Sequence, residues 1–146
     1  MALKLNDKLA SGIRAHGEAA YPHECCGALL GCHTGADRET RALLPLLNRR
    51  TDSPQNRFSV SAADVRTAEQ AAAAQGLDLI GWYHSHPDHP AQPSDYDREH
   101  AWPWYSYVIV SVHSGHGAEL TAWRLAEDRS AFEHEPLESA ASISKR

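Results

Sequence analysis

Hydrophobic and polar positions along this chain follow the period of strands in some segments and that of helices in others. The clearest strand pattern is Tyr105–Val112, and Leu120–Leu125 is expected to pair with it across a Gly-containing turn. The apolar run Asp78–Tyr83 follows a turn at Gly76 and predicts another buried strand. Further strands are predicted at Cys25–Cys32, at Thr40–Asn48 with a break at Pro45, at Arg57–Val60 and, as an edge strand, at Phe132–Leu137.

Three other segments have apolar residues at helical spacing, each with a capping residue near an end. The predicted helices are Leu3–Ala20 with Asn6 or Asp7 as an early cap, Ser61–Gln75 closed by Gly76, and Asp95–Ala101 with Ser94 as N-cap. Strands mixed with helices indicate an α/β sandwich. With 146 residues, 42% of them hydrophobic, the chain has enough apolar surface for one core and little room for a second. We therefore expect one domain over residues 1–137 and a flexible polar tail over residues 138–146.

Charge and cysteine content narrow the setting. The net charge of -5 is spread along the chain, without the Lys/Arg stripe that phosphate contacts need, so nucleic-acid binding is not expected. No apolar run reaches membrane-spanning length, and the first residues lack the apolar segment of a secretion signal. Cys25, Cys26 and Cys32 are an odd number without Cys-x-x-Cys spacing, which indicates a reducing compartment rather than disulfides or a cysteine metal site. We expect the cytoplasm.

The main chemical signal is a His-x-His pair, His84 and His86, followed by Ser94 and Asp97. Side chains two apart on a strand point to the same face, so both imidazoles are expected to project together. The loop after them contains Pro87, Pro90 and Pro93, which restrict its backbone, before a helix that begins near Asp97. Two imidazoles and one carboxylate give three ligands, and catalytic zinc sites typically leave the fourth position to water. The spacing therefore predicts a hydrolytic metal site.

A purely structural interpretation exists for the second half of this set. Ser94 and Asp97 have the spacing of a capping box, in which both side chains satisfy backbone donors at a helix start. Taken without the histidines, this pair is more typical of a cap than of a catalytic site. Two histidines and a carboxylate also suit divalent ions other than zinc. His89, in the same loop, is interpreted as a rim residue, and Trp102–Tyr105 as aromatic packing beside a helix.

These residues resemble the signature of the JAMM (MPN-plus) metallopeptidases. The resemblance implies that His84, His86 and Asp97 bind zinc and that Ser94 stabilises an oxyanion. It also implies that a glutamate near the start of the chain is the general base, and Glu24 in the segment Tyr21–Gly31 matches it. The implied fold is a single-domain MPN sandwich, similar to cytidine deaminases, with a mixed β-sheet flanked by helices. The resemblance covers roughly residues 3–126, with no motif residue substituted.

The resemblance also suggests a substrate. Stand-alone bacterial members of this family, which the segments around Glu24 and His84 resemble, are associated with ubiquitin-like sulfur carrier proteins. The implied reaction is zinc-dependent hydrolysis of the peptide or isopeptide bond after a C-terminal Gly-Gly. Two alternatives stay open: a deubiquitinase-like isopeptidase of a bacterial conjugation or defence system, and a non-catalytic MPN binding module. A nucleoside deaminase would need a Pro-Cys-x-x-Cys element, which the chain lacks. The sequence leaves the oligomeric state open.

Overall fold

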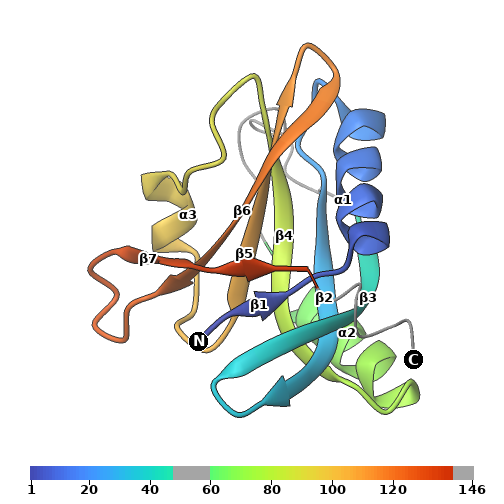
Figure 1. The fold of residues 1–146 in the computed structure, drawn as a ribbon, viewed down its shortest axis with the longest axis vertical. Helices are drawn as coiled ribbons and strands as arrows, with labels where there is room; N and C mark the ends of the chain where they lie inside the picture. Colours follow the sequence, from blue (N-terminus) through green and yellow to red (C-terminus); the bar gives the residue numbers. More distant parts are fainter. Residues whose placement is uncertain (48–59, 140–146) are drawn as a thin grey trace.

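The computed structural model describes residues 1–47 and 60–139 of the chain. Its helices are interspersed among the strands up to α3, and the last four elements of the chain are strands (Figure 1). In chain order they are β1 (Leu3–Lys4), α1 (Asp7–Ala20), β2 (Cys26–Thr34), β3 (Asp37–Leu46), α2 (Ala62–Ala74), β4 (Asp78–Pro87), α3 (Asp95–Glu99), β5 (Ser106–His113), β6 (His116–Leu125), β7 (Phe132–Glu135) and β8 (Leu137–Glu138).

Within residues 1–47 and 60–139 the strands form one mixed sheet of eight, in the order β7-β6-β5-β4-β2-β3-β1-β8. The strands at the two ends of this order, β7 and β8, are separated in sequence only by Pro136, so the sheet curls until its ends meet. Strand β1 holds β8 in the sheet, and the Leu3 backbone N–H donates to the Pro136 carbonyl at 2.9 Å. The longest parallel pair is β4 with β5, while β2 runs antiparallel to both β3 and β4.

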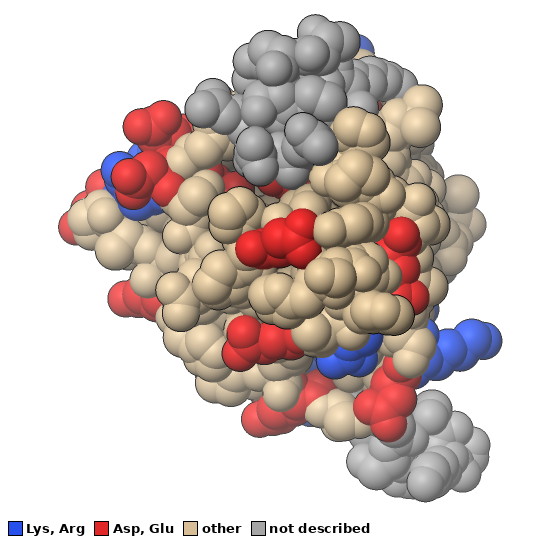
Figure 2. Space-filling view, turned by 90° about the horizontal axis from the view of Figure 1, so that it is seen from above, with Lys and Arg blue, Asp and Glu red and all other residues tan. Residues whose placement is uncertain are grey.

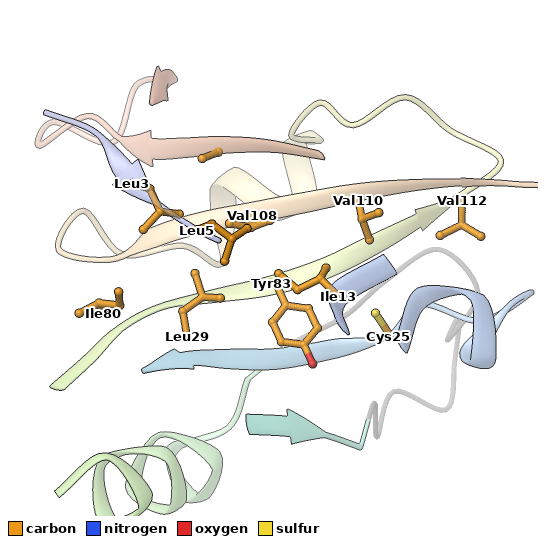
Figure 3. Close-up of a cluster of buried hydrophobic side chains, with 11 residues drawn as sticks. Leu3, Leu5, Ile13, Cys25, Leu29, Ile80, Tyr83, Val108, Val110 and Val112 are labelled. Atoms are coloured by element: carbon orange, nitrogen blue, oxygen red, sulfur yellow. The ribbon is translucent and has the colours of Figure 1, made fainter. Parts of the chain in front are cut away.

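Two apolar clusters cover the two faces of the sheet. The first lies between the sheet and α1 (Figure 3), and it contains Ile13, Tyr83, Val108 and Val110. Helix α1 approaches the sheet closely at Gly17, where an added Cβ would lie 2.9 Å from the Val112 side chain. The second lies on the opposite face under α2 and consists of Ala28, Leu30, Ala68, Ala72, Trp82, Ala101, Tyr105, Tyr107 and Leu125.

The alternation of β4 assigns its residues to these two faces. Tyr83 belongs to the cluster under α1, whereas Trp82 belongs to the cluster under α2. Because side chains alternate along a strand, His84 and His86 share the face of Trp82, away from α1. The end of β4 leads into a loop that carries the chain over to α3 (Figure 1). The histidines therefore lie on the face that α3 also reaches.

The predicted α/β fold, a mixed sheet flanked by helices, is confirmed, but several boundaries differ. The first helix begins at Asp7 rather than Leu3, because the Asn6 side chain caps it by accepting from the Leu9 N–H at 2.8 Å. Residues Leu3–Lys4 instead form β1. The predicted break at Pro45 is wrong, since β3 continues through it. Within the described residues β1 pairs only with Arg38 and Glu39 of β3, so Pro45 lies on an open edge, where a missing N–H is tolerated.

Other predicted segments fare unequally. The capped helix after Ser61 is confirmed, and Gly76 follows it with a φ of +69°. Helix α3 is shorter than predicted and ends at Glu99. Pro136 divides the predicted edge strand into β7 and β8, and Glu138 of β8 pairs with Lys4 of β1. Of the predicted strand Arg57–Val60, residues 57–59 lie outside the described residues, as do Asn48 and the tail residues 140–146. The predicted domain and tail boundary stays a prediction.

The surface bears on binding partners. Figure 2 shows acidic and basic groups scattered among other residues on one face, without a continuous basic stripe among the atoms described there. Neither stretch of described residues, 1–47 or 60–139, contains a helix long and apolar enough to cross a membrane.

Candidate metal centre and active site

Three side chains converge at the end of β4. The Nε2 atoms of His84 and His86 lie 3.2 Å apart. The Oδ2 atom of Asp97, at the start of α3, lies 3.3 Å from the first and 3.2 Å from the second. His84 is buried, with 2% of its surface exposed, and the Asp97 side chain is 10% exposed. Strand β4 and helix α3 thus bring three potential ligand atoms to one point.

The shape of this triangle fits a metal ion. In a tetrahedral zinc site with ligand distances of about 2.0–2.1 Å, neighbouring ligand atoms lie about 3.3 Å apart. The three observed edges of 3.2, 3.2 and 3.3 Å match this spacing. A hydrogen-bond network alone would not require this triangle. Each imidazole could contact the carboxylate oxygen without the two ring nitrogens also lying 3.2 Å from each other. In the part of the chain that the structure describes, His84, His86 and Asp97 form the one group with metal-ligand spacing.

The orientation of His86 is fixed by the loop that follows it. Its Nδ1 atom lies 2.9 Å from the carbonyl oxygen of Pro90. A carbonyl only accepts, so Nδ1 carries a proton, and in the neutral ring Nε2 then presents a lone pair toward Asp97 and His84. A hydrogen bond of this kind from the second ring nitrogen is the usual support of a metal-binding histidine. The neutral tautomer that a metal requires is therefore built into the loop.

The choice between capping and catalysis for Ser94 and Asp97 proves unnecessary. The capping box is present: the Ser94 Oγ accepts from the Asp97 N–H at 3.1 Å, and the Asp97 Oδ2 accepts from the Ser94 N–H at 3.0 Å. The same Oδ2 atom lies against both histidines. A serine hydroxyl has one proton and two lone pairs, so accepting a bond leaves the proton of Ser94 available for donation. The cap positions both side chains without consuming the function predicted for either.

The groups around Asp97 control its protonation. Burial alone would raise the pKa of the carboxyl, but the facing imidazoles of His84 and His86 and the hydrogen bond from the Ser94 N–H outweigh burial. They hold the pKa of Asp97 far below its ordinary range. The carboxyl is therefore ionised at neutral pH, as a metal ligand must be.

Glu24 approaches the same site from the start of β2, the strand that pairs with β4. Cys26 pairs with His84 in the antiparallel β2–β4 ladder, and the Ser85 N–H donates to the Cys25 carbonyl at 3.2 Å. Continuing that register places Glu24 beside His86 and on the same face as both histidines. Glu24, His86 and Ser94 line one open cleft of about 370 Å³. The predicted general base, a predicted ligand and the predicted oxyanion donor therefore share a cavity.

Burial controls the protonation of Glu24. The residue is only 4% exposed, and burial, with a further contribution from the Asp97 charge, raises its pKa to about 9. In the absence of a cation the carboxyl is thus protonated at neutral pH. A divalent cation at the His84–His86–Asp97 position would favour the ionised form, because a nearby positive charge lowers a carboxyl pKa.

His89 was interpreted as a rim residue, and it is exposed and lines the open cleft. Gln92, which the sequence did not single out, lines the cleft together with Pro90 and Pro93. The proline-rich spacing of this loop was visible in the sequence, but the direction of its side chains was not. The aromatic packing predicted for Trp102–Tyr105 is confirmed for Trp102 and Tyr105, which pack in the apolar cluster under α2. Trp104 differs from the prediction, because it is 60% exposed. Cys25 and Cys26 are buried thiols, and Cys32 is a partly buried one.

Comparison with protein families now connects this geometry to known proteins. Residues 6–126 match the model of the prokaryotic homologs of the JAB domain, which is most of the chain. The chain belongs to the prokaryotic JAB family. All five predicted site residues of this JAB domain lie within the matched range.

Three curated relatives resemble the JAB domain over similar lengths. The protein named Desampylase from Haloferax volcanii is 32% identical over 112 residues, covering 76% of this chain and 78% of that protein. A probable TtuB-protein conjugate cleaving protease from Thermus thermophilus is 34% identical over 104 residues, covering 71% and 66%. Tail tip assembly protein K of Escherichia phage N15 is 30% identical over 115 residues, and the match spans only 42% of that longer protein.

Solved structures agree on the fold of the JAB domain. A protein from Salinibacter ruber is 47% identical, with a TM-score of 0.75 over 95% of this chain and 91% of that one. A JAB1/MPN domain protein from Archaeoglobus fulgidus is 18% identical, with a TM-score of 0.59 over 95% of this chain and 98% of its own. The second likeness shows the fold alone, and it agrees with the predicted MPN sandwich.

The capping boxes of α2 and α3 allow a controlled test of the metal centre. Asp97→Ala should lower zinc affinity more than about 100-fold, beyond the range typical of groups that only support a ligand. Asp64→Ala breaks the equivalent capping box at the start of α2, and it should leave zinc affinity unchanged. Competition with a chromophoric chelator measures both. Equal zinc affinity in the two variants would leave Asp97 with a capping role only.

The protonation of Glu24 makes the stability of the metal-free domain depend on pH. Its folded pKa of about 9 lies above its ordinary value of 4.5, so the stabilisation is complete below pH 4.5 and is lost as the pH rises toward 9. Relative to Glu24→Gln, the metal-free wild type should lose roughly 1.4 kcal/mol of unfolding free energy per pH unit across this window. Urea titrations with chelator from pH 5 to 8 measure it. Parallel curves for the two proteins would contradict the predicted burial of the carboxyl.

Proposed function

We propose that this JAB domain is a zinc-dependent peptidase or isopeptidase that hydrolyses the bond after the C-terminal Gly-Gly of a ubiquitin-like protein, such as a sulfur carrier. The observation that carries the proposal is the metal-ligand spacing of His84, His86 and Asp97, of which His86 lines the cleft that also contains Glu24 and Ser94. Two relatives support it by their names, Desampylase and a probable protease that cleaves TtuB-protein conjugates. We propose the cytoplasm as the setting, because the odd number of cysteines in the chain favours a reducing compartment.

His84, His86 and Asp97 would hold the zinc ion, which when bound acidifies water and polarises a carbonyl. Glu24 is the base in this proposal: it takes a proton from the attacking water and returns it to the leaving amine. A new C–O bond forms at the glycine carbonyl as the C–N bond breaks, so the products are a carboxylate and an amine. Burial raises the pKa of Glu24 and a bound cation would lower it, and the base of this cycle needs both its ionised and its protonated form.

Ser94 would stabilise the charge that develops on the carbonyl oxygen. Its Oγ already accepts from the Asp97 N–H, which directs the remaining proton away from the helix. A donor fixed before the reaction contributes more than a free one, because it does not reorganise as charge develops. The cap of α3 thus serves as the support of an oxyanion donor.

The alternatives from the sequence are an isopeptidase of a bacterial conjugation or defence system and a non-catalytic binding module. The first uses the same site chemistry and differs only in the protein attached to the substrate. The second is opposed by the complete set of Glu24, Ser94 and three ligand atoms with metal spacing. A domain that kept its partner after losing the metal would favour the binding module.

Turnover should depend on Glu24 while metal binding does not. Wild-type protein loaded with zinc should remove an extension placed after the Gly-Gly of a small ubiquitin-like carrier, and intact-mass spectrometry measures the loss. Glu24→Gln should bind zinc equally and show no turnover, because the amide cannot take a proton. Undiminished turnover in this variant would remove Glu24 from its proposed role. Zinc bound by wild type without cleavage of any carrier or conjugate would favour the binding module.

Ser94 and Ser61 form a matched pair for testing the oxyanion donor. Each caps a helix with an Asp three residues later, so Ser94→Ala and Ser61→Ala should both lose about 1 kcal/mol of stability. Only Ser94→Ala should also lower kcat by about 100-fold, with little change in KM, because the donor acts on the developing charge. Steady-state kinetics with the carrier substrate separates the two. Similar kcat values for both variants would restrict Ser94 to capping.

A further inference from the structure

The loop between β4 and α3 is held by its carbonyl oxygens. Three consecutive carbonyls each accept a hydrogen bond from a side chain. The His89 oxygen accepts from the Ser111 Oγ at 2.8 Å, and the Ala91 oxygen accepts from the Thr121 Oγ1 at 2.6 Å. The Pro90 oxygen between them lies 2.9 Å from the His86 Nδ1. The carbonyl that orients the predicted ligand is thus flanked on both sides by anchors from β5 and β6.

Both anchors have their protons directed by a further contact. The indole Nε1 of Trp123 only donates, and it lies 2.8 Å from the Thr121 Oγ1, so the threonine proton is left for Ala91. Ser111 has a single proton, which goes to His89, so the His113 Nε2 at 2.8 Å must be the donor to it. Each hydroxyl therefore has one partner on each side, and its proton has one direction.

Ser111 has a special place in the sheet. It is almost fully buried, with 1% exposed, and it lies opposite His86 in the parallel β4–β5 ladder. The register of the β5–β6 pairing shifts between Val110 and Val112, so Ser111 sits in an irregularity of that ladder. Bulges of this kind are common beside functional sites, where they redirect a side chain. Here the irregular position carries the hydroxyl that reaches the loop.

We propose that Ser111 and Thr121 are positioning residues that lock the β4–α3 loop and thereby orient His86 toward the metal position. The proline-rich loop forms no strand or helix between Pro87 and Asp95, so side chains of the sheet supply donors that a backbone ladder would otherwise provide. With Pro90 held on both sides, the His86 ring has one hydrogen-bonded orientation and one tautomer. The inference rests on the proposed function only where it concerns zinc.

Three variants and one control test the anchors. Ser111→Ala and Thr121→Val remove one hydroxyl each with little change of shape, and the double variant removes both. Ser106→Ala is the matched control, because Ser106 is equally buried on the same strand and its Oγ accepts from Arg38 at 2.8 Å, at the far end of β5. Two readouts apply: the His86 tautomer by ¹⁵N NMR of the metal-free protein, assigned with His86→Gln, and zinc affinity by chelator competition.

The wild type should show a single His86 tautomer with the proton on Nδ1, and the double variant a mixture of both tautomers. Zinc affinity should fall about 10-fold in the double variant, the loss typical of removing support from a ligand. Ser106→Ala should lose stability but change neither readout. A double variant with the wild-type tautomer and zinc affinity would overturn the inference, and the single variants give the same test if the double variant fails to fold. Changed tautomers without zinc binding in any protein would support the anchors and count against the proposed function instead.

Discussion

Strands β4 and β5 run parallel, and parallel neighbours cannot be joined by a tight turn. The chain must leave the end of β4, cross over and return to the start of β5, and this crossover contains the proline-rich loop and α3. The pairing begins where Gly81 meets Ser106, and an added Cβ at Gly81 would lie 2.1 Å from the Ser106 carbonyl oxygen. Only glycine permits that approach. Because α3 lies within this crossover, its first turn stays near the end of β4, where Asp97 contacts His84 and His86.

Burying this site has a cost that the rest of the fold must offset. Glu24 and His84 are nearly inaccessible, and Asp97 is largely so. Burial of ionisable groups without compensation is expensive, and here it raises the pKa of Glu24. The capping box, the Pro90 carbonyl and the anchored loop supply part of the compensation as hydrogen bonds. A divalent cation held by His84, His86 and Asp97 would add to this compensation, because it interacts favourably with the ionised carboxylate of Asp97 and with an ionised Glu24.

The sequence predicted features that are local and missed those that depend on distant pairing. Alternation along β4 predicted that His84 and His86 share a face, and the Ser94–Asp97 spacing predicted both the cap and the position of the carboxylate. The two-residue strands β1 and β8 have no sequence pattern of their own, since they exist only by pairing with each other and with β3. The anchors Ser111 and Thr121 were equally hidden. They look like ordinary strand residues, and their partners lie 22 and 30 positions away.

The chain contains its own demonstration that a motif takes its meaning from its surroundings. Ser61 and Asp64 open α2 with the same spacing and the same two hydrogen bonds as Ser94 and Asp97 at α3. At α2 the cap contributes only to the start of a helix that packs small residues against the sheet. At α3 the identical cap holds a carboxylate oxygen against two imidazoles, which the β4–β5 crossover brings beneath it. The difference between a cap and a candidate metal ligand thus lies in the sheet opposite, and not in the four residues themselves.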